Sequence, residues 1–187
     1  AQTQLAPPEL RAIHPLGKSP VIQDGDILVA ETGAIVEYLL ETRAGHGLRP
    51  QPGTADGRRF TYWLHYAEGS AMTPLLLKLI FSSLPKRSPG LIRPIVGAVA
   101  GKVQTSFIDP QIASHTAYWE AELGKSAWFA GDRFSAADIM MSFPLEAGAS
   151  RVPYGPDKPR LKAFLTAIHA RPAYQRALER GGPYAYA

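Results

Sequence analysis

The sequence predicts an α/β segment with the order helix, strand, strand, helix, followed by a larger all-helical segment. Near the N-terminus, the turn signal Asp24-Gly25 separates two short apolar stretches, as in an antiparallel hairpin. From about residue 58 onward, strand signals cease and apolar residues recur at helical spacing. A stretch rich in proline and glycine separates the two patterns. We therefore expect domains at residues 1–48 and 55–187, joined by a linker at 49–54.

Composition narrows the class of protein. The chain has 187 residues, of which 45% are hydrophobic and 19% charged, which is typical of a globular protein. It contains no cysteine, which excludes a disulfide scaffold, a cysteine-ligated metal site and a cysteine nucleophile in these residues, and we expect no metal. No apolar run reaches the roughly 18 residues of a membrane span, and no secretory signal is visible. These features favour a cytoplasmic protein without a membrane partner.

The net charge favours small anionic ligands over nucleic acid. The formal charge is +4, but the basic residues are scattered and form no stripe with exposed aromatic residues. We therefore expect no nucleic-acid partner, and a mildly positive field that attracts small anions.

The first segment begins with a short helix at about residues 9–13. His14-Pro15 ends this helix, because the residue before a proline avoids the α region. A strand begins at Val21, since proline is tolerated directly before or at a strand start. After the turn, Ile27–Val29 forms the partner strand.

The second helix of this segment opens at Glu31-Thr32. We expect Thr32 to be the N-cap and Glu31 to add negative charge beside the helix start. Two glycines, Gly45 and Gly47, end the helix. A hairpin with two helices buries too little surface to be stable alone, so it must pack on the helical segment, on another chain or on residues outside this sequence.

The helical segment opens with two long helical regions. The first covers Arg58–Leu84, and Pro74 should bend or break it. A proline-rich loop follows at 85–94. The second region covers Ile95–Leu123, with a bend or a restart at Asp109-Pro110.

The motif FSAADI at residues 134–139 predicts a helix start. Ser135 can cap the N–H of Asp138, and the Asp138 carboxylate can reach back to the N–H of Ser135, which together form a capping box. Phe134 and Ile139 stand at the positions of a hydrophobic staple. We therefore interpret Asp138 as a structural residue, although it is an acid among apolar neighbours. Three helices are predicted from here on, at about 135–148, 158–170 and 173–180.

Three motifs stand in an order that is specific when they are taken together. They are HPLGKSPVI, DGD and AETGAIVEYL within residues 14–39, WFAGD and FSAADI within residues 128–139, and RPAY at 171–174. In this order they resemble the glutathione S-transferase family of the bacterial cytosolic type, over nearly the whole chain. The resemblance implies a thioredoxin-like domain followed by an all-helical C-terminal domain.

The sequence departs from the family pattern at its N-terminus. The family's first domain has the order βαβαββα, and the sequence shown begins at the second helix of that order. The family's catalytic tyrosine, serine or cysteine lies in the part that is absent, so we assign no catalytic residue. We expect the sequence shown to be incomplete rather than to belong to a truncated relative.

The residues around the hairpin are the candidate glutathione site. The N–H groups and dipole of the helix start favour a carboxylate or phosphate, although from the residues alone a plain N-cap is the more common explanation of Glu31-Thr32. The resemblance implies that Glu31 and Thr32 bind the γ-glutamyl end of glutathione. It also implies that Ser19-Pro20 is a cis peptide, and that the backbone of Val21 pairs with the cysteinyl part. Lys18 would then meet the glycyl carboxylate; a solvated loop lysine is the alternative.

Two further residues have less specific signals. Tyr66 lies on the first long helix, which in the family lines the cleft of the second substrate, so we expect Tyr66 to contact that substrate; packing in the core is the alternative. His14 precedes a proline, and either a general base or a loop-packing residue fits it.

The resemblance implies a cytoplasmic, homodimeric glutathione S-transferase with a role in detoxification. Glutathione would be a substrate, and its thiolate would attack a hydrophobic electrophile. One alternative is a non-catalytic transferase-like binding or assembly module. The other is a different glutathione-dependent enzyme, such as an isomerase, a dehalogenase or a peroxidase.

Overall fold

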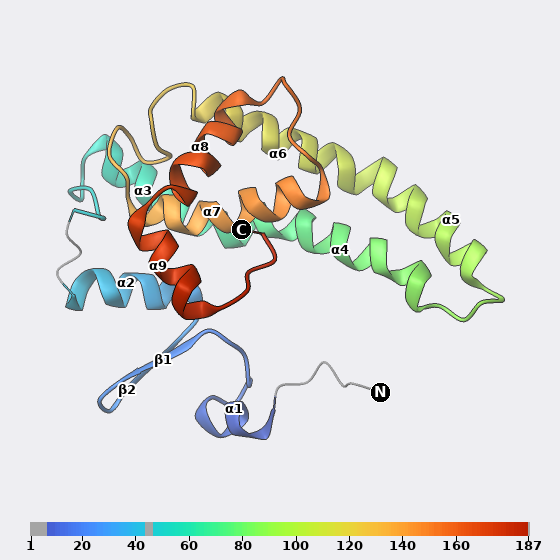
Figure 1. Cartoon of the computed structure of the whole chain (residues 1–187), viewed down its shortest axis with the longest axis horizontal. Coiled ribbons are helices and arrows are strands. Elements are labelled where there is room, and N and C mark those ends of the chain that lie inside the picture. The colour runs from blue at the N-terminus through green and yellow to red at the C-terminus, as the bar shows by residue number, and fades with distance from the viewer. Residues whose placement is uncertain (1–6, 44–46, 187) are drawn as a thin grey trace. The chain divides into compact units, whose positions relative to one another are not determined.

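The chain folds into two compact units, Ala1–Arg49 and Pro50–Ala187 (Figure 1). The computed structural model describes residues 7–43 and 47–186. Gly45, one of the two glycines expected to end the second helix, lies outside the described residues. The first unit has the predicted order helix, strand, strand, helix, and the second is built from helices.

Two helices accompany an antiparallel hairpin in the first unit. In chain order the elements are α1 (Pro8–Ile13), β1 (Val21–Asp24), β2 (Ile27–Ala30) and α2 (Thr32–Thr42). All four lie within a few residues of their predicted positions, because each has a local signal such as a proline, a turn or an apolar repeat.

The hairpin turn lies one residue later than predicted. Asp24 pairs with Ile27 across the hairpin, so the turn consists of Gly25 and Asp26 rather than Asp24 and Gly25. Gly25 has a φ of +60°. Only glycine adopts this angle without a steric penalty, and a two-residue hairpin loop requires it.

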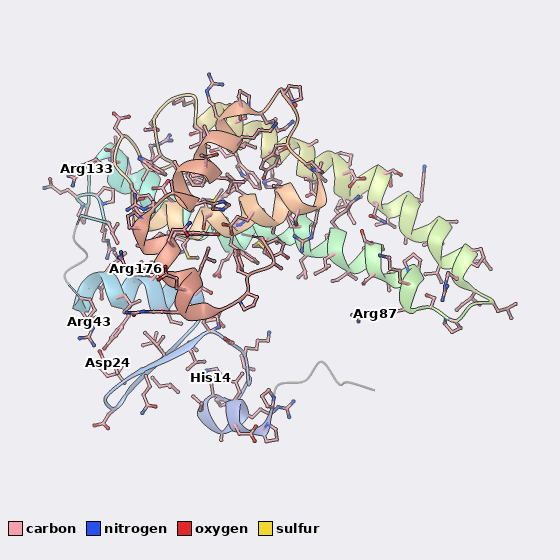
Figure 2. The ribbon with its side chains drawn as sticks, viewed as in Figure 1. His14, Asp24, Arg43, Arg87, Arg133 and Arg176 are labelled. Atoms are coloured by element: carbon pink, nitrogen blue, oxygen red, sulfur yellow. The ribbon has the colours of Figure 1, made fainter. Side chains whose placement is uncertain are left out.

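Asp24 connects the end of the hairpin to helix α2. Its Oδ2 accepts a hydrogen bond of 2.9 Å from the hydroxyl of Tyr38, and the Arg43 guanidinium forms an ion pair with the same carboxylate (Figure 2). The hydrogen bond to Asp24 raises the pKa of Tyr38. Within α2 only Ile35 is buried, and this small interior is what we expect of a hairpin with two helices.

A π-helical turn interrupts each of the two long helical regions. The first region consists of α3 (Ala55–Tyr66), η1 (Ala67–Ala71) and α4 (Met72–Arg87), and the second of α5 (Arg93–Val103), η2 (Gln104–Ile108) and α6 (Asp109–Glu122). Pro74 and Pro110 follow these turns closely. A proline has no N–H and crowds the carbonyl four residues earlier, which in both cases lies in the π-helical turn. The predicted interruptions are therefore confirmed, in the form of π-helical turns.

Helix α4 extends further than predicted. The loop expected at residues 85–94 covers only 88–92, since α4 includes Pro85 and ends at Arg87. Pro85 lies in the last turn of the helix, where it removes one backbone hydrogen bond close to an end that would fray in any case.

Three more helices complete the second unit and enclose its core. They are α7 (Ala136–Arg151), α8 (Pro159–His169) and α9 (Pro172–Gly181). The core contains an aromatic group in which the ring of Trp63 lies 4.5 Å from that of Phe129, and Phe129 lies 5.1 Å from Phe164. An aliphatic cluster of Leu75, Ile108, Ile112 and Ala147 joins α4, η2, α6 and α7. No helix in the described parts of the chain combines the length and the apolar character needed to cross a bilayer.

Candidate functional site

The register of the hairpin brings two separate stretches of sequence together. Val21, the first residue of β1, pairs with Ala30, the last residue of β2. Paired strands lie about 4.8 Å apart, so the stretch ending in Pro20-Val21 meets Glu31-Thr32 at one end of the hairpin. Within the described residues the sheet has two strands, and no other strand pairs with the second edge of β1.

The stretch before β1 has the backbone that the family resemblance implied. The peptide bond between Ser19 and Pro20 is cis. Lys18, Ser19 and Pro20 are exposed, and Val21 is half-buried. These residues are therefore accessible to a ligand at the start of the strand.

Glu31 is the N-cap of α2, and the prediction that Thr32 is the N-cap is wrong by one residue. The carbonyl of Glu31 already accepts the first helical hydrogen bond, from the N–H of Ile35 at 2.9 Å, while its φ of 73° lies outside the helix. Glu31 is the one non-glycine residue with a positive φ in the described part of the chain. Such a conformation costs roughly 1–3 kcal/mol and is typical of binding sites.

The start of α2 can bind an anion. The Glu31 side chain makes no capping hydrogen bond, and Thr32 occupies the first helical position, where backbone N–H groups have no partner within the helix. The helix has 11 residues, so its dipole adds positive potential at this end. The hydroxyl of Thr32 stands beside these N–H groups and can add a further donor.

Two opposite charges flank this end of the hairpin. The described residues offer neither Lys18 nor Glu31 an ion-pair or hydrogen-bond partner for its side chain. Asp24, at the other end of the hairpin, is already engaged by Tyr38 and Arg43. Lys18 can therefore meet a ligand carboxylate, and Glu31 can meet a ligand ammonium group.

His14 lies in the loop that leads to this stretch. Its carbonyl accepts a hydrogen bond of 2.7 Å from the N–H of Gly17, which shapes the loop. Its Nδ1 is buried and finds no hydrogen-bond partner among the described residues. Both interpretations of His14, as a base and as a packing residue, are compatible with this geometry. The described ranges also contain no cluster of histidine and acidic side chains suited to a metal ion.

Tyr66, the predicted second-substrate residue, lies in a polar and aromatic cluster of the second unit. Its hydroxyl contacts Nδ1 of His115 and accepts a hydrogen bond of 3.1 Å from Nε1 of Trp119. The ring of Tyr62 stacks on that of Tyr66 at 5.4 Å. Burial raises the pKa of Tyr66 to about 12 and lowers the pKa of His115. Tyr66 is therefore a neutral phenol whose hydroxyl is fixed by α6, while Tyr62 extends its aromatic surface toward solvent.

The interpretation of Ser135 and Asp138 as a structural cap is confirmed. Ser135 precedes the first residue of α7, and both halves of the capping box are present. Oδ2 of Asp138 accepts hydrogen bonds from the N–H and the hydroxyl of Ser135, at 2.8 and 2.9 Å. Phe134 contacts Trp128 and lies under the Arg171 guanidinium, while Ile139 is about half exposed.

Comparison with known proteins gives one consistent family. The profile of the glutathione S-transferase N-terminal domain matches residues 1–41, and that of the C-terminal domain matches residues 106–172. Glutathione S-transferase 1 of Saccharomyces cerevisiae is 32% identical over 185 residues, which cover 94% of this chain and 79% of the yeast protein. Glutathione S-transferase 3 of Zea mays is 30% identical, with coverage of 91% and 75%.

Solved structures agree with these sequence relatives. The crystal structure of a glutathione S-transferase from Actinobacillus pleuropneumoniae is 31% identical, with a TM-score of 0.66 and coverage of 94% of this chain and 74% of that chain. The theta class enzyme from Xanthomonas axonopodis pv. citri, solved with glutathione bound, is 26% identical, with a TM-score of 0.69 and coverage of 94% and 79%.

The fold, a thioredoxin-like part with a helical C-terminal domain, defines a transferase of the glutathione-dependent class. The chain belongs to the glutathione S-transferase family. The predictions of the family, the fold class, the enzyme class and glutathione as substrate are confirmed.

Proposed function

We propose that glutathione binds where the cis-proline stretch meets the start of α2. The register Val21 to Ala30, which places the two stretches together, is the observation that supports this site most strongly. Glutathione has a carboxylate at each end, an ammonium group at one end and an extended backbone between them. This end of the hairpin offers a matching group for each of these features.

Each residue has a distinct role in the proposed site. The N–H groups of α2 and the Thr32 hydroxyl bind the γ-glutamyl carboxylate, and Glu31 accepts from the adjacent ammonium group. The backbone of Val21, directed by Ser19 and Pro20, pairs with the cysteinyl part as an added strand would. Lys18 meets the glycyl carboxylate at the other end of the ligand.

The bound thiol then reacts as a thiolate with an electrophilic carbon. One carbon–sulfur bond forms, and the thiol proton goes to solvent. In a substitution the leaving group departs with the electron pair of its broken bond; in an addition the π bond breaks and its electron pair moves to the far atom, which takes up a proton. Holding both reactants in one site converts a bimolecular reaction into an effectively unimolecular one. We assign none of the residues above to the activation of the thiol.

Replacing Thr32 with alanine tests the γ-glutamyl site. We expect Thr32→Ala to weaken glutathione binding about tenfold, since it removes one hydrogen bond to a charged group, while alanine at the first helical position preserves the fold. Isothermal titration calorimetry measures the affinity. Thr42→Ala is the matched control, because Thr42 lies at the other end of the same helix and its hydroxyl donates to the Tyr38 carbonyl. Equal affinities for wild type and Thr32→Ala would refute the assignment.

We further propose that the electrophile packs on the aromatic surface of Tyr66 and Tyr62. The Tyr66 hydroxyl is held by His115 and Trp119, so the aromatic ring itself is the group that meets an apolar substrate. We expect Tyr66→Leu to raise the KM for an aromatic electrophile several-fold with the KM for glutathione unchanged. Steady-state kinetics with each substrate varied in turn measure this, and Phe107→Leu is the control, because Phe107 is an exposed aromatic residue outside this cluster. An unchanged KM for the electrophile would argue that Tyr66 is a core residue.

The remaining expectations concern the setting of the enzyme. We propose a homodimer with a role in the detoxification of electrophiles in the cytoplasm. The small interior of the first unit supports a partner surface, because only Ile35 of α2 is buried while Leu39 of the same helix is 42% exposed.

A further inference from the structure

Helix α2 is held to the hairpin by one buried side chain and by polar contacts toward its C-terminal end. Ile35 is the one fully buried residue of the helix. The hydroxyl of Tyr38 donates a hydrogen bond of 2.9 Å to Oδ2 of Asp24, and the Arg43 guanidinium forms an ion pair with the same carboxylate (Figure 2). Among the described residues, these are the two polar side-chain contacts that join the helix and its C-cap to the hairpin. We call Asp24, Tyr38 and Arg43 the Asp24 clamp.

The Asp24 clamp lies at the end of the hairpin opposite to the proposed glutathione site. Asp24 is the last residue of β1, whereas the proposed site lies where Val21 pairs with Ala30. Helix α2 therefore leaves the site end of the hairpin at Thr32 and returns to the turn end at Arg43. Its 11 residues span about 16 Å, close to the ~13 Å of a strand of four residues. Contacts at both ends thus fix the direction of the helix axis along the hairpin.

The junction between β2 and α2 is a single residue with an unfavourable backbone conformation. Glu31 has a φ of 73°, in the left-handed region that disfavours residues with a Cβ atom. Its side chain makes no capping hydrogen bond that would stabilise this conformation. A change of the backbone angles at this residue would change the direction of α2 relative to β1. The conformation of Glu31 is therefore maintained by the packing of Ile35 and by the Asp24 clamp.

We propose that the Asp24 clamp positions the start of α2 for glutathione, an inference that rests on the function proposed above. The N–H groups of the helix start and the backbone of Val21 bind adjacent parts of one ligand, so their relative direction matters. The clamp keeps both groups at one end of the hairpin before the ligand arrives. Glutathione then binds a preformed site and avoids the loss of affinity that ordering the helix would impose.

The members of the Asp24 clamp are positioning residues of unequal weight. They lie away from the proposed ligand groups and act through the helix. The ion pair contributes little, because its Arg43 and Asp24 side chains are 62% and 39% exposed. Tyr38 is half-buried, and its hydrogen bond to Asp24 raises its pKa, so the phenol is protonated and donates at neutral pH. We therefore expect Asp24 and Tyr38 to have larger effects than Arg43.

Titration of the full chain with glutathione by calorimetry tests the inference. We expect Tyr38→Phe to raise the Kd about threefold and Asp24→Ala about tenfold, because the population with a correctly directed α2 falls. The double variant should bind like Asp24→Ala, since the Tyr38 hydroxyl loses its acceptor once Asp24 is replaced. Arg43→Gln should change the Kd less than about twofold. Asp26→Ala is the matched control, because Asp26 is an exposed acid of the same turn, and it should bind like wild type.

Two further readouts separate positioning from a general loss of structure. In steady-state kinetics, Asp24→Ala should raise the KM for glutathione about tenfold, with kcat at saturating glutathione and the KM for the electrophile unchanged. Saturating glutathione restores the correct direction of α2, which is why kcat is preserved. Hydrogen exchange measured without glutathione should be several-fold faster than in wild type at the N–H of Ile35, which bonds to the Glu31 carbonyl.

The outcomes distinguish the clamp from the glutathione site itself. Wild-type affinity in Tyr38→Phe and Asp24→Ala, with weaker binding by Thr32→Ala, would overturn the clamp and leave the proposed site intact. Additive effects in the double variant, an equal loss in Asp26→Ala, or a fall in kcat with an unchanged KM for glutathione would overturn it as well. If Thr32→Ala binds like wild type, the proposed site fails and hydrogen exchange decides separately whether Asp24 positions α2. Unchanged exchange at Ile35 would then overturn the clamp.

Discussion

Asp138→Ala is expected to lower the free energy of unfolding of the helical unit by about 3–5 kcal/mol. The Asp138 side chain is fully buried, and its carboxylate accepts three hydrogen bonds. Two come from Ser135, and the third comes from the N–H of Phe129 at 2.8 Å. Alanine leaves these donors buried without an acceptor, and each unsatisfied donor costs about 1–3 kcal/mol.

The contact with Phe129 makes this effect larger than the loss of an ordinary helix cap. The carbonyl of Phe129 accepts hydrogen bonds from the Arg59 guanidinium at 2.8 and 3.1 Å. Arg59 in turn forms an ion pair of 2.9 Å with Glu122. Asp138 therefore connects α7 through one loop residue to α3 and α6, whereas a typical cap contributes only about 1 kcal/mol.

Thermal unfolding followed by circular dichroism at the helical band measures this prediction. A loss of about 3–5 kcal/mol corresponds to a fall in Tm of about 10 °C in a chain of this size. Asp132→Ala is the matched control, since Asp132 is an exposed acid six residues earlier and should change stability by less than about 0.5 kcal/mol. A similar Tm for Asp138→Ala and Asp132→Ala would mean that the buried carboxylate does not stabilise the fold.

Asp138 also shows how far local sequence predicts structure. The capping box could be identified because Ser135 and Asp138 are three residues apart and their contact depends on a single helix start. The bonds to Phe129 and onward to Arg59 join residues up to 70 positions apart. No periodicity or turn signal encodes such a pairing, so these contacts appear only in the folded chain.

The element boundaries show the same limit on a smaller scale. The hairpin turn lies at Gly25-Asp26, one residue later than predicted. The N-cap of α2 is Glu31, one residue earlier than predicted. Asp24 has a side chain that turns prefer, and Thr32 has one that N-caps prefer. The backbone hydrogen bonds, however, decide where the turn lies and where the helix begins. The pairing of Asp24 with Ile27 and the bond from Ile35 to Glu31 are properties of the folded hairpin and helix.

The residues of the candidate site could be named from sequence motifs, but the side chains that contact Tyr66 could not. Lys18, Pro20 and Glu31 stand in motifs that resemble a known family, and the hairpin register then brings the two stretches together. The contact of Tyr66 with His115 joins residues 49 positions apart, and His115 had no signal of its own beyond its residue type.

Glu146 is another buried acid of the helical unit, and no sequence motif predicts its partners. It lies inside α7, and its carboxylate accepts hydrogen bonds from three residues beyond that helix. Nε2 of His169 lies 2.9 Å away, and the hydroxyls of Tyr174 and Tyr184 lie at 3.0 and 2.5 Å. Burial, with the charge of Glu146, raises the pKa of both tyrosines, to about 12 for Tyr174, so both phenols donate at neutral pH.

This carboxylate holds the C-terminal residues on the helical unit. Tyr184 follows α9, and Tyr186, two residues later, packs against Phe143 with 5.8 Å between the ring centroids. The segment has no regular structure to stabilise it, so its order depends on such side-chain contacts. Removing Glu146 should therefore release the segment as well as destabilise α8 and α9.

Glu146→Ala is expected to lower the free energy of unfolding by about 2–4 kcal/mol, because three donors lose a shared charged acceptor. Limited proteolysis under native conditions should remove the residues after α9 faster than in wild type, since these residues lose their anchor. Mass spectrometry identifies the cleavage site and thermal unfolding gives the change in stability. Glu179→Ala is the control, because Glu179 is an exposed acid on α9. If Glu146→Ala loses stability but its C-terminal segment resists the protease as wild type does, Glu146 supports the helices without anchoring that segment.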